Sequence, residues 1–324
     1  MNTKLNTRPL ILPAVLFLLA AHALPAQMTP TQRLTEAYAL EREGKPALAI
    51  TELQELLDSK SLDAAGSGKA WNVLGLSYED QGDLAHAQHA YETSLHILES
   101  LPDNIRDCAM ALDDFGGIYV TTGQFDVANQ LRTKALGLYE QLNDHAGEAR
   151  AFSHLAGTAF SQKNLRDGSK QLKRATREAK LASDLDDEDR AAIASLNGWQ
   201  AQLEGDAEAS VASYRQSLDL LKRRHGEEHP STGWGYLLLG EADAAAGQLD
   251  PALQEMRQGL AILGRTVSDQ NPHYLVAELA YSRVLDEAGF HVEAAKLKAV
   301  AKPQLNDAYR AQCPGCTVSA AALR

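Results

Sequence analysis

The sequence contains very little cysteine, and this scarcity limits how the chain can be stabilised. Only three cysteines, Cys108, Cys313 and Cys316, occur among 324 residues. Disulfide-built domains are short and rich in cysteine, whereas a chain of this length can bury a core without crosslinks. We therefore expect the core to be held together by side-chain packing.

An excess of positive charge is also absent, which argues against two classes of partner. Lysine and arginine number 31 and aspartate and glutamate number 43, so the formal net charge is -12. An acidic surface repels phosphate backbones and anionic lipid headgroups. The composition disfavours binding to nucleic acid and to a membrane surface.

Long apolar runs are missing except at the N-terminus. Two basic residues, Lys4 and Arg8, precede an apolar run over residues 10–21, and a small-residue segment follows at 24–26. A membrane-spanning helix needs about 20 apolar residues, and this run is shorter. The pattern is typical of a secretory signal peptide. We predict that residues 1–26 are such a peptide, and that the mature chain is exported to a bacterial periplasm or secreted, with no membrane insertion after cleavage.

Internal repetition is what the sequence has in abundance. In the segment WNVLGLSYEDQGDLAHAQHAYETSL, residues 71–95, Trp71, Leu74 and Tyr78 recur at helical spacing, and Gly82 then interrupts the helix. Equivalent turn positions follow at steps of 38 to 42 residues and are occupied by Gly44, Gly82, Gly123, Lys163, Gly205, Gly247 and Gly289. A glycine there can adopt a positive φ without steric cost. Seven pairs of antiparallel helices are thus expected over residues 27–302.

Two further sets of equivalent positions hold only small residues. Seven places before each turn the residues are Ala37, Gly75, Gly116, Ala156, Gly198, Gly240 and Ser282, and five places after it they are Ala49, Ala87, Ala128, Gly168, Ser210, Ala252 and Ala294. Two helix axes approach to about 8 Å only where little side chain lies between them. The pattern predicts that the two helices of each pair cross tightly at these positions.

These residues resemble the tetratricopeptide-repeat family. Residues 71–78 match its W-x2-L-G-x2-Y motif. The long period and the pair His229-Pro230 before a helix are similar to kinesin-light-chain repeats. The resemblance implies an all-α, right-handed α-solenoid of antiparallel helix pairs, which acts as a scaffold and binds a protein or peptide ligand in its concave groove. It implies neither catalysis nor a cofactor.

The concave groove can be assigned side chains by their offset from the turns. These are Tyr38, Asn72, Leu76, Glu79, Asp113, Phe160, Trp199, Gln202, Trp234, Glu241 and Arg283, together with Val120, Arg150 and Asp286. Aromatic side chains concentrate binding energy at interfaces, and the alternative is that these rings only cover neighbouring repeats. The mixture of acidic and aromatic residues predicts an apolar partner segment that carries some basic residues.

The motif Cys313-Pro314-Gly315-Cys316 is the strongest candidate for chemistry in the sequence. A dithiol-exchange enzyme places its first cysteine at a helix N-terminus within a βαβ unit, and no strand pattern surrounds this motif. In an oxidising compartment we expect a local disulfide between the two cysteines that closes a tail over residues 303–324. The alternative function is a thiol-redox or metal-handling accessory protein that acts through both cysteines.

A histidine cluster offers a weaker candidate for metal binding. His86, His89 and His96 fall on one side of a predicted helix, and Glu92 is the one carboxylate at close spacing. A zinc site needs three or four ligands that converge on one point, and His96 is two turns from His89. We interpret these histidines as a solvated helix face and predict no metal site.

Overall fold

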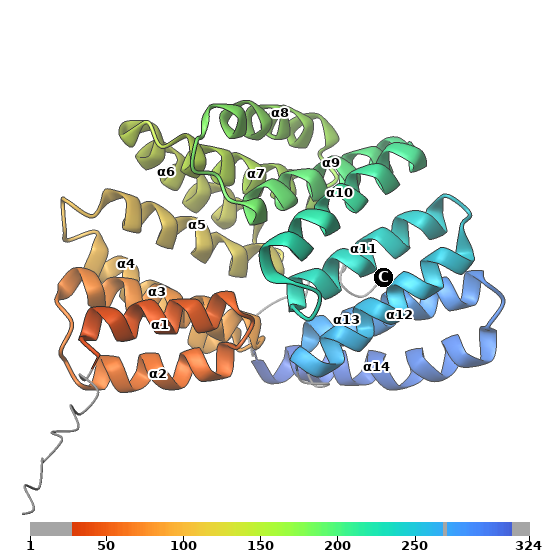
Figure 1. The fold of residues 1–324 in the computed structure, drawn as a ribbon, viewed down its shortest axis with the longest axis horizontal. Helices are drawn as coiled ribbons and strands as arrows, with labels where there is room; N and C mark the ends of the chain where they lie inside the picture. The colour runs from red at the N-terminus through yellow and green to blue at the C-terminus, as the bar shows by residue number, and fades with distance from the viewer. Residues whose placement is uncertain (1–27, 268–270, 313–324) are drawn as a thin grey trace, which may run out of the picture.

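The computed structural model describes residues 28–267 and 271–312, and within these ranges the chain contains fourteen α-helices and no strand (Figure 1). The all-α fold class is thereby confirmed. The predicted signal peptide at 1–26 and the Cys313–Cys316 motif lie outside the described residues. None of the described helices is long and apolar enough to cross a membrane.

The helices form seven consecutive pairs, as the turn positions predict. The first members are α1 (Pro30–Arg42), α3 (Ala64–Asp80), α5 (Ile105–Thr121), α7 (His145–Ser161), α9 (Asp187–Glu204), α11 (Pro230–Ala245) and α13 (Pro272–Glu287). The second members are α2 (Pro46–Asp58), α4 (Leu84–Leu98), α6 (Phe125–Leu142), α8 (Leu165–Leu181), α10 (Ala207–His225), α12 (Leu249–Thr266) and α14 (His291–Gln312). Each helix packs on its pair partner, and successive pairs pack on one another. The pairs stack into a curved α-solenoid (Figure 1).

The turn residue of every pair has a positive φ. The seven values lie between +59° and +86°. Lys163, which stands where the other six turns have glycine, adopts φ +59°. The turn of the fourth pair therefore has the same left-handed backbone conformation as the others, although this conformation is unfavourable for a residue with a side chain.

The small-residue positions mark the helix crossings, as predicted. A Cβ atom added to Gly75 of α3 would lie 2.7 Å from the Tyr91 ring of α4, and one added to Gly240 of α11 would lie 2.5 Å from Met256 Cγ of α12. Ala87 is fully buried at the equivalent position of α4. The absence of side chain at these points is what allows the two helices of a pair to approach closely.

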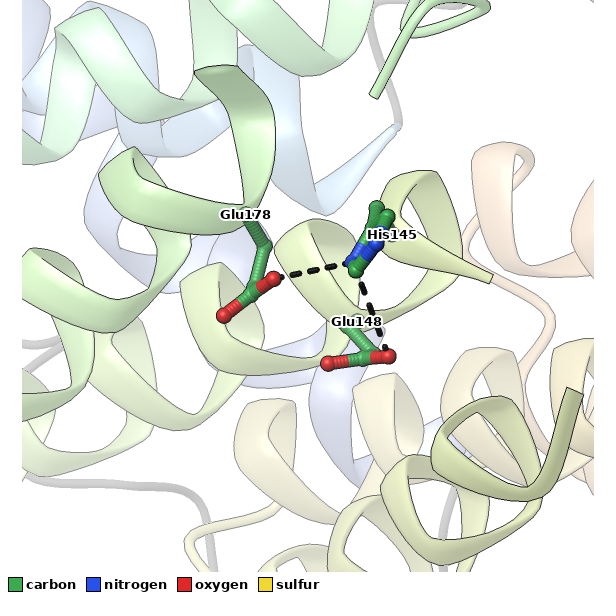
Figure 2. A group of neighbouring side chains, drawn as sticks. All are labelled: His145, Glu148 and Glu178. Atoms are coloured by element: carbon green, nitrogen blue, oxygen red, sulfur yellow. Dashed lines mark hydrogen bonds and ion pairs between the residues drawn. The ribbon is translucent and has the colours of Figure 1, made fainter. Parts of the chain in front are cut away.

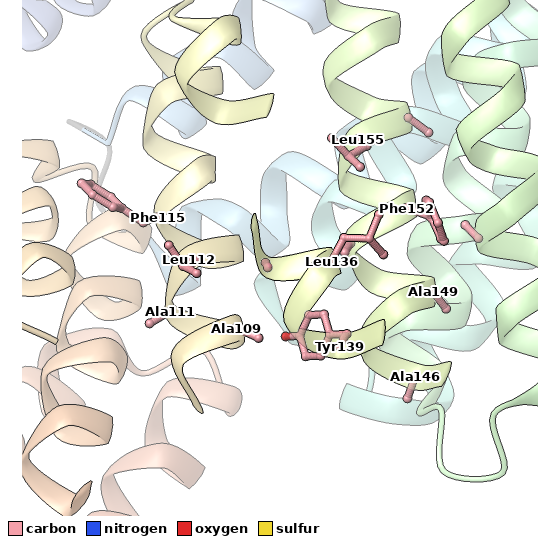
Figure 3. Close-up of a cluster of buried hydrophobic side chains, with 14 of the residues drawn as sticks. Ala109, Ala111, Leu112, Phe115, Leu136, Tyr139, Ala146, Ala149, Phe152 and Leu155 are labelled. Atoms are coloured by element: carbon pink, nitrogen blue, oxygen red, sulfur yellow. The ribbon is translucent and has the colours of Figure 1, made fainter. Parts of the chain in front are cut away.

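One large hydrophobic cluster extends across several neighbouring pairs. The largest cluster of buried side chains spans several repeats and includes Leu112 of α5, Tyr139 of α6 and Phe152 of α7 (Figure 3). Repeats that share side chains with their neighbours in this way are stable only as a stack. The array therefore behaves as one structural unit along this stretch.

The last helix extends further than the sequence suggested. We expected a tail from residue 303, but α14 continues to Gln312 with Pro303 inside it. Proline removes one backbone hydrogen bond from a helix. Ala301 and Leu305 on either side are fully buried in a cluster with Leu275 of α13, and this packing holds the helix together beyond the proline.

The array curves until its first two pairs meet its fifth to seventh pairs. The Arg42 guanidinium pairs with Asp186 at 2.8 Å, and the Arg42 carbonyl lies 3.1 Å from His229 Nε2. The Asn271 amide donates to the Asp80 carbonyl at 2.9 Å. We refer to these three interactions as the closing contacts, and they join the start of the array to its later pairs.

Candidate ligand-binding chamber

A cavity of about 530 Å³ lies between the first two pairs and the later pairs, next to the closing contacts. We refer to it as the central chamber. Its ionisable lining consists of Glu41, Asp80, Asp114, Asp186, Glu188 and Asp189, with Arg42 and Arg150, and with His154, His225, His229 and His273. Acidic side chains thus outnumber arginines three to one.

Both arginines of the chamber are already paired. Arg150 donates to the two carboxylate oxygens of Asp189 at 3.0 and 2.9 Å. Arg42 lies 2.8 Å from Asp186 and 3.7 Å from Glu188. The two arginines therefore form ion pairs with three of the six carboxylates, Asp186, Glu188 and Asp189.

The remaining carboxylates have no cation partner among the described residues. Asp114 accepts a hydrogen bond from the Asn72 amide at 2.9 Å, whereas the ion pairs of the chamber leave out Glu41 and Asp80. Partial removal from water and the neighbouring carboxylates raise the pKa of Glu41 to about 8 and the pKa of Asp80 to about 6. Near pH 7 Glu41 is thus largely protonated and Asp80 largely ionised, and a positively charged occupant would favour the ionised form of both.

Two histidines form part of the chamber wall between α10 and α11. The rings of His225 and His229 are stacked with centroids 4.1 Å apart. Burial and the His225 charge lower the pKa of His229 to about 4. His229 is consequently neutral near pH 7, and its Nδ1 accepts a hydrogen bond from the backbone N–H of Ser231 at 3.2 Å.

A second cavity of about 550 Å³ adjoins the chamber, and His154 lines both. We refer to it as the side groove. Its walls are more apolar, with Trp199, Tyr214 and Leu238. An apolar segment that enters the side groove can thus continue toward the acidic chamber.

Many of the side chains assigned to the concave face do line these cavities. Tyr38, Leu76, Arg150 and Trp234 line the chamber, and Val120, Trp199, Gln202 and Glu241 line the side groove. Asn72 and Tyr38 border a third hollow of about 370 Å³. These residues come from six different first helices, α1, α3, α5, α7, α9 and α11, so the inner face is built along the whole array.

Other assigned side chains lie elsewhere. Phe160 is 1% exposed and packs against Trp199 with ring centroids 5.6 Å apart, so it belongs to the core. Asp113 is buried beside His154, with its carboxylate 3.0 Å from Nδ1. Glu79 accepts from the Tyr91 hydroxyl at 3.0 Å. Arg283 is exposed and pairs with Glu241 at the surface.

Comparison with known proteins identifies the repeats. A family model described as tetratricopeptide repeat matches residues 189–265, and a second model of the same description matches residues 68–97. The chain is a tetratricopeptide-repeat protein. No curated protein matches this tetratricopeptide-repeat sequence.

Three solved structures with the same fold are distant from this chain in sequence. The Rap conjugation gene regulator of plasmid pLS20, in complex with the Phr* peptide, is 14% identical with a TM-score of 0.57, and the match covers 88% of this chain and 91% of that one. Cut9 from the APC/C hetero-tetramer Cut9-Hcn1 is 16% identical, TM-score 0.61, over 85% and 48% of the two chains. BtubC (BKLC) from P. vanneervenii is 17% identical, TM-score 0.53, over 70% and 91%. Because the identities are this low, these matches establish the fold of this tetratricopeptide-repeat protein and nothing about its function.

The acidic residues of the chamber were not among the side chains assigned to the concave groove from the sequence. Glu41 and Asp80 stand at the C-terminal ends of α1 and α3, and Glu188 stands in the first turn of α9. The offsets from the turns selected mid-helix positions on single repeats. The one signal in the sequence that could have identified them is the presence of acidic residues beside the turns of a tetratricopeptide-repeat array. Their proximity in space depends on the closing contacts, which the sequence does not predict.

The alternative function through Cys313 and Cys316 gains nothing from these comparisons. Both cysteines lie outside the described residues. The matched family models are described only as tetratricopeptide repeats, so they give no support for a thiol-based function.

Proposed function

We propose that this protein is an exported scaffold that binds a protein or peptide segment through its concave surface, and that it has no catalytic role. The observation that carries the proposal is the acidic chamber that adjoins an apolar groove. Clefts with apolar walls and a few charged groups are the usual form of binding sites. The sequence pattern of residues 1–26 supports export.

The charge of the chamber favours a partner segment with lysine or arginine. Glu41 and Asp80 have no cation within ion-pair distance among the described residues, and Asp114 has only an amide partner. An ammonium or guanidinium group between such carboxylates is attracted strongly because water is partly excluded from the cavity. Trp199 and Leu238 in the side groove would receive the apolar part of the same segment.

One of the structural neighbours supports a peptide as the ligand. The Rap regulator of plasmid pLS20 was solved with the Phr* peptide. Its chain has the same fold over most of its length. A helical array of this fold can thus bind a peptide.

The test uses two fluorescent peptides of equal length, one with apolar and basic residues and one with apolar and acidic residues. Binding to the mature chain is measured by fluorescence polarisation at low and high salt. We expect the basic peptide to bind at least about tenfold more tightly at low salt, and to lose this advantage as salt screens the charges. Equal binding of the two peptides at low salt would refute the proposed partner chemistry.

A further inference from the structure

Three potential metal ligands converge outside the cavities described above. His145 is the first residue of α7, Glu148 follows three residues later, and Glu178 lies near the end of α8 (Figure 2). Positions i and i+3 share one side of a helix, so both α7 residues face the end of α8. The cluster is thus built across the two helices of the fourth pair.

The distances within the cluster match those between ligands of one metal ion. His145 Nδ1 lies 3.0 Å from Glu178 Oε2 and 3.9 Å from Glu148 Oε1. One ligand atom from each residue lies within 4.8 Å of the other two. Zinc bonds of about 2.0–2.2 Å in a tetrahedral arrangement separate ligand atoms by about 3.4 Å. Small side-chain rotations would therefore bring all three atoms to bonding distance.

The two carboxylates of the cluster are largely buried, whereas its histidine is partly exposed to solvent. The side chain of Glu178 is 2% exposed and that of Glu148 is 12% exposed, whereas that of His145 is 41% exposed. An ion can thus reach the three ligands from solvent past the imidazole. A water molecule can complete the coordination on the same side.

Negative charge exceeds positive charge around the cluster. Arg177 donates to Glu178 Oε1 at 2.8 Å, which leaves Oε2 directed at His145. Among the described residues Glu148 forms an ion pair with His145 and with no arginine or lysine. Glu140 of the neighbouring α6 adds a further negative charge to its surroundings. Carboxylates removed from water require a cation, and Arg177 supplies one charge for two of them.

We propose that His145, Glu148 and Glu178 bind a divalent transition-metal ion of the zinc type and thereby tie the start of α7 to the end of α8. One imidazole and two carboxylates suit Zn²⁺ or Mn²⁺, whereas Ca²⁺ takes six to eight oxygen ligands. The proposal replaces our expectation from the sequence that no metal site is present. It is independent of the ligand in the central chamber, because none of the three residues lines the chamber or the side groove.

The test is a titration of the metal-stripped mature chain with Zn²⁺ by isothermal calorimetry. Cys313→Ser and Cys316→Ser are introduced throughout so that thiols do not contribute. We expect one tight equivalent of zinc and a higher melting temperature with zinc. Glu148→Gln is expected to lower the affinity at least about tenfold and to abolish the rise in melting temperature.

Glu140→Gln is the matched control, because it removes the same charge nearby without removing a ligand. Because Glu140 is not one of the three ligands, its replacement should weaken zinc binding far less than Glu148→Gln does. His145→Ala provides a second ligand variant at an exposed helix start, so that the test does not depend on one variant being folded. Equal zinc affinity in the parent, the control and both ligand variants would overturn the proposal, as would a parent chain that binds no zinc.

Discussion

At the scale of single residues, Lys163 differs from the free chain in its backbone conformation and His229 differs from it in its pKa. Lys163 adopts a left-handed backbone conformation at a turn that elsewhere uses glycine. His229 is kept neutral between the Arg42 carbonyl and the Ser231 N–H. Each therefore contributes to stability in a way that one substitution can measure.

Lys163→Gly should stabilise the protein. A left-handed conformation costs an ordinary residue about 1–2 kcal/mol, and the greater freedom of glycine in the unfolded chain offsets part of the gain. We expect the free energy of unfolding to rise by about 0.5–1 kcal/mol in a urea titration. An unchanged or lower midpoint would show that this turn is not strained by the lysine.

His229 should make stability depend on pH. In the unfolded chain its pKa is about 6.5, and the fold lowers its pKa to about 4. Between these values the unfolded state binds more protons, so stability is complete above about pH 6.5 and is lost as the pH falls toward 4. His229→Asn retains a capping side chain and should flatten the stability profile between pH 4 and 6.5.

His96→Asn is the control for this pH profile, because His96 is exposed. Its urea midpoints from pH 4 to 7 should follow those of the parent chain. If His229→Asn and His96→Asn have the same profile, His229 is not the group responsible.

At the scale of helices, local pattern determines most of the structure. The helix pairs, their turns and their crossing points follow from spacing that repeats within about 42 residues, and the sequence predicts all three. Two features depended on longer-range packing instead. Helix α14 continues through Pro303 because Leu305 packs on α13, and Phe160 turns into the core against Trp199.

A pair of glycine substitutions tests the crossing points. In Gly240→Ala the added methyl group would lie 2.5 Å from Met256 Cγ and 2.9 Å from the Ala252 carbonyl oxygen, and overpacking of this kind costs about 1–3 kcal/mol. Gly137→Ala in α6 has no atom within 4 Å of the new methyl group and should stabilise by up to about 1 kcal/mol. Thermal unfolding that moved both variants in the same direction would contradict this account.

Truncation separates the end of α14 from the segment beyond it. A chain that stops at Lys302 loses Leu305, whose side chain is fully buried, and should melt at a lower temperature. A chain that stops at Gln312 retains this packing and should melt with the parent. Equal melting temperatures for the two truncated chains would show that the end of α14 does not stabilise the array.

At the scale of the whole molecule, the site depends on curvature accumulated over seven pairs. Arg42 and His229 are 187 residues apart and meet only because the array closes. Spacing within one repeat therefore predicts Trp199 and Trp234 on the inner face but cannot predict that Glu41, Asp80 and Asp114 share one chamber. The charge of the chamber is a property of the closed array.

The central claim is that these chamber carboxylates select a basic partner segment. The most direct measurement compares the affinity of the basic peptide for the parent chain, for a Glu41→Gln, Asp80→Asn double variant, and for a Glu36→Gln, Glu140→Gln double variant. The last pair likewise replaces two carboxyl groups by amides, but at exposed positions on α1 and α6. We predict that the chamber variant loses at least about tenfold in affinity at low salt and that the surface variant binds like the parent. Equal affinity of the two double variants would contradict the account.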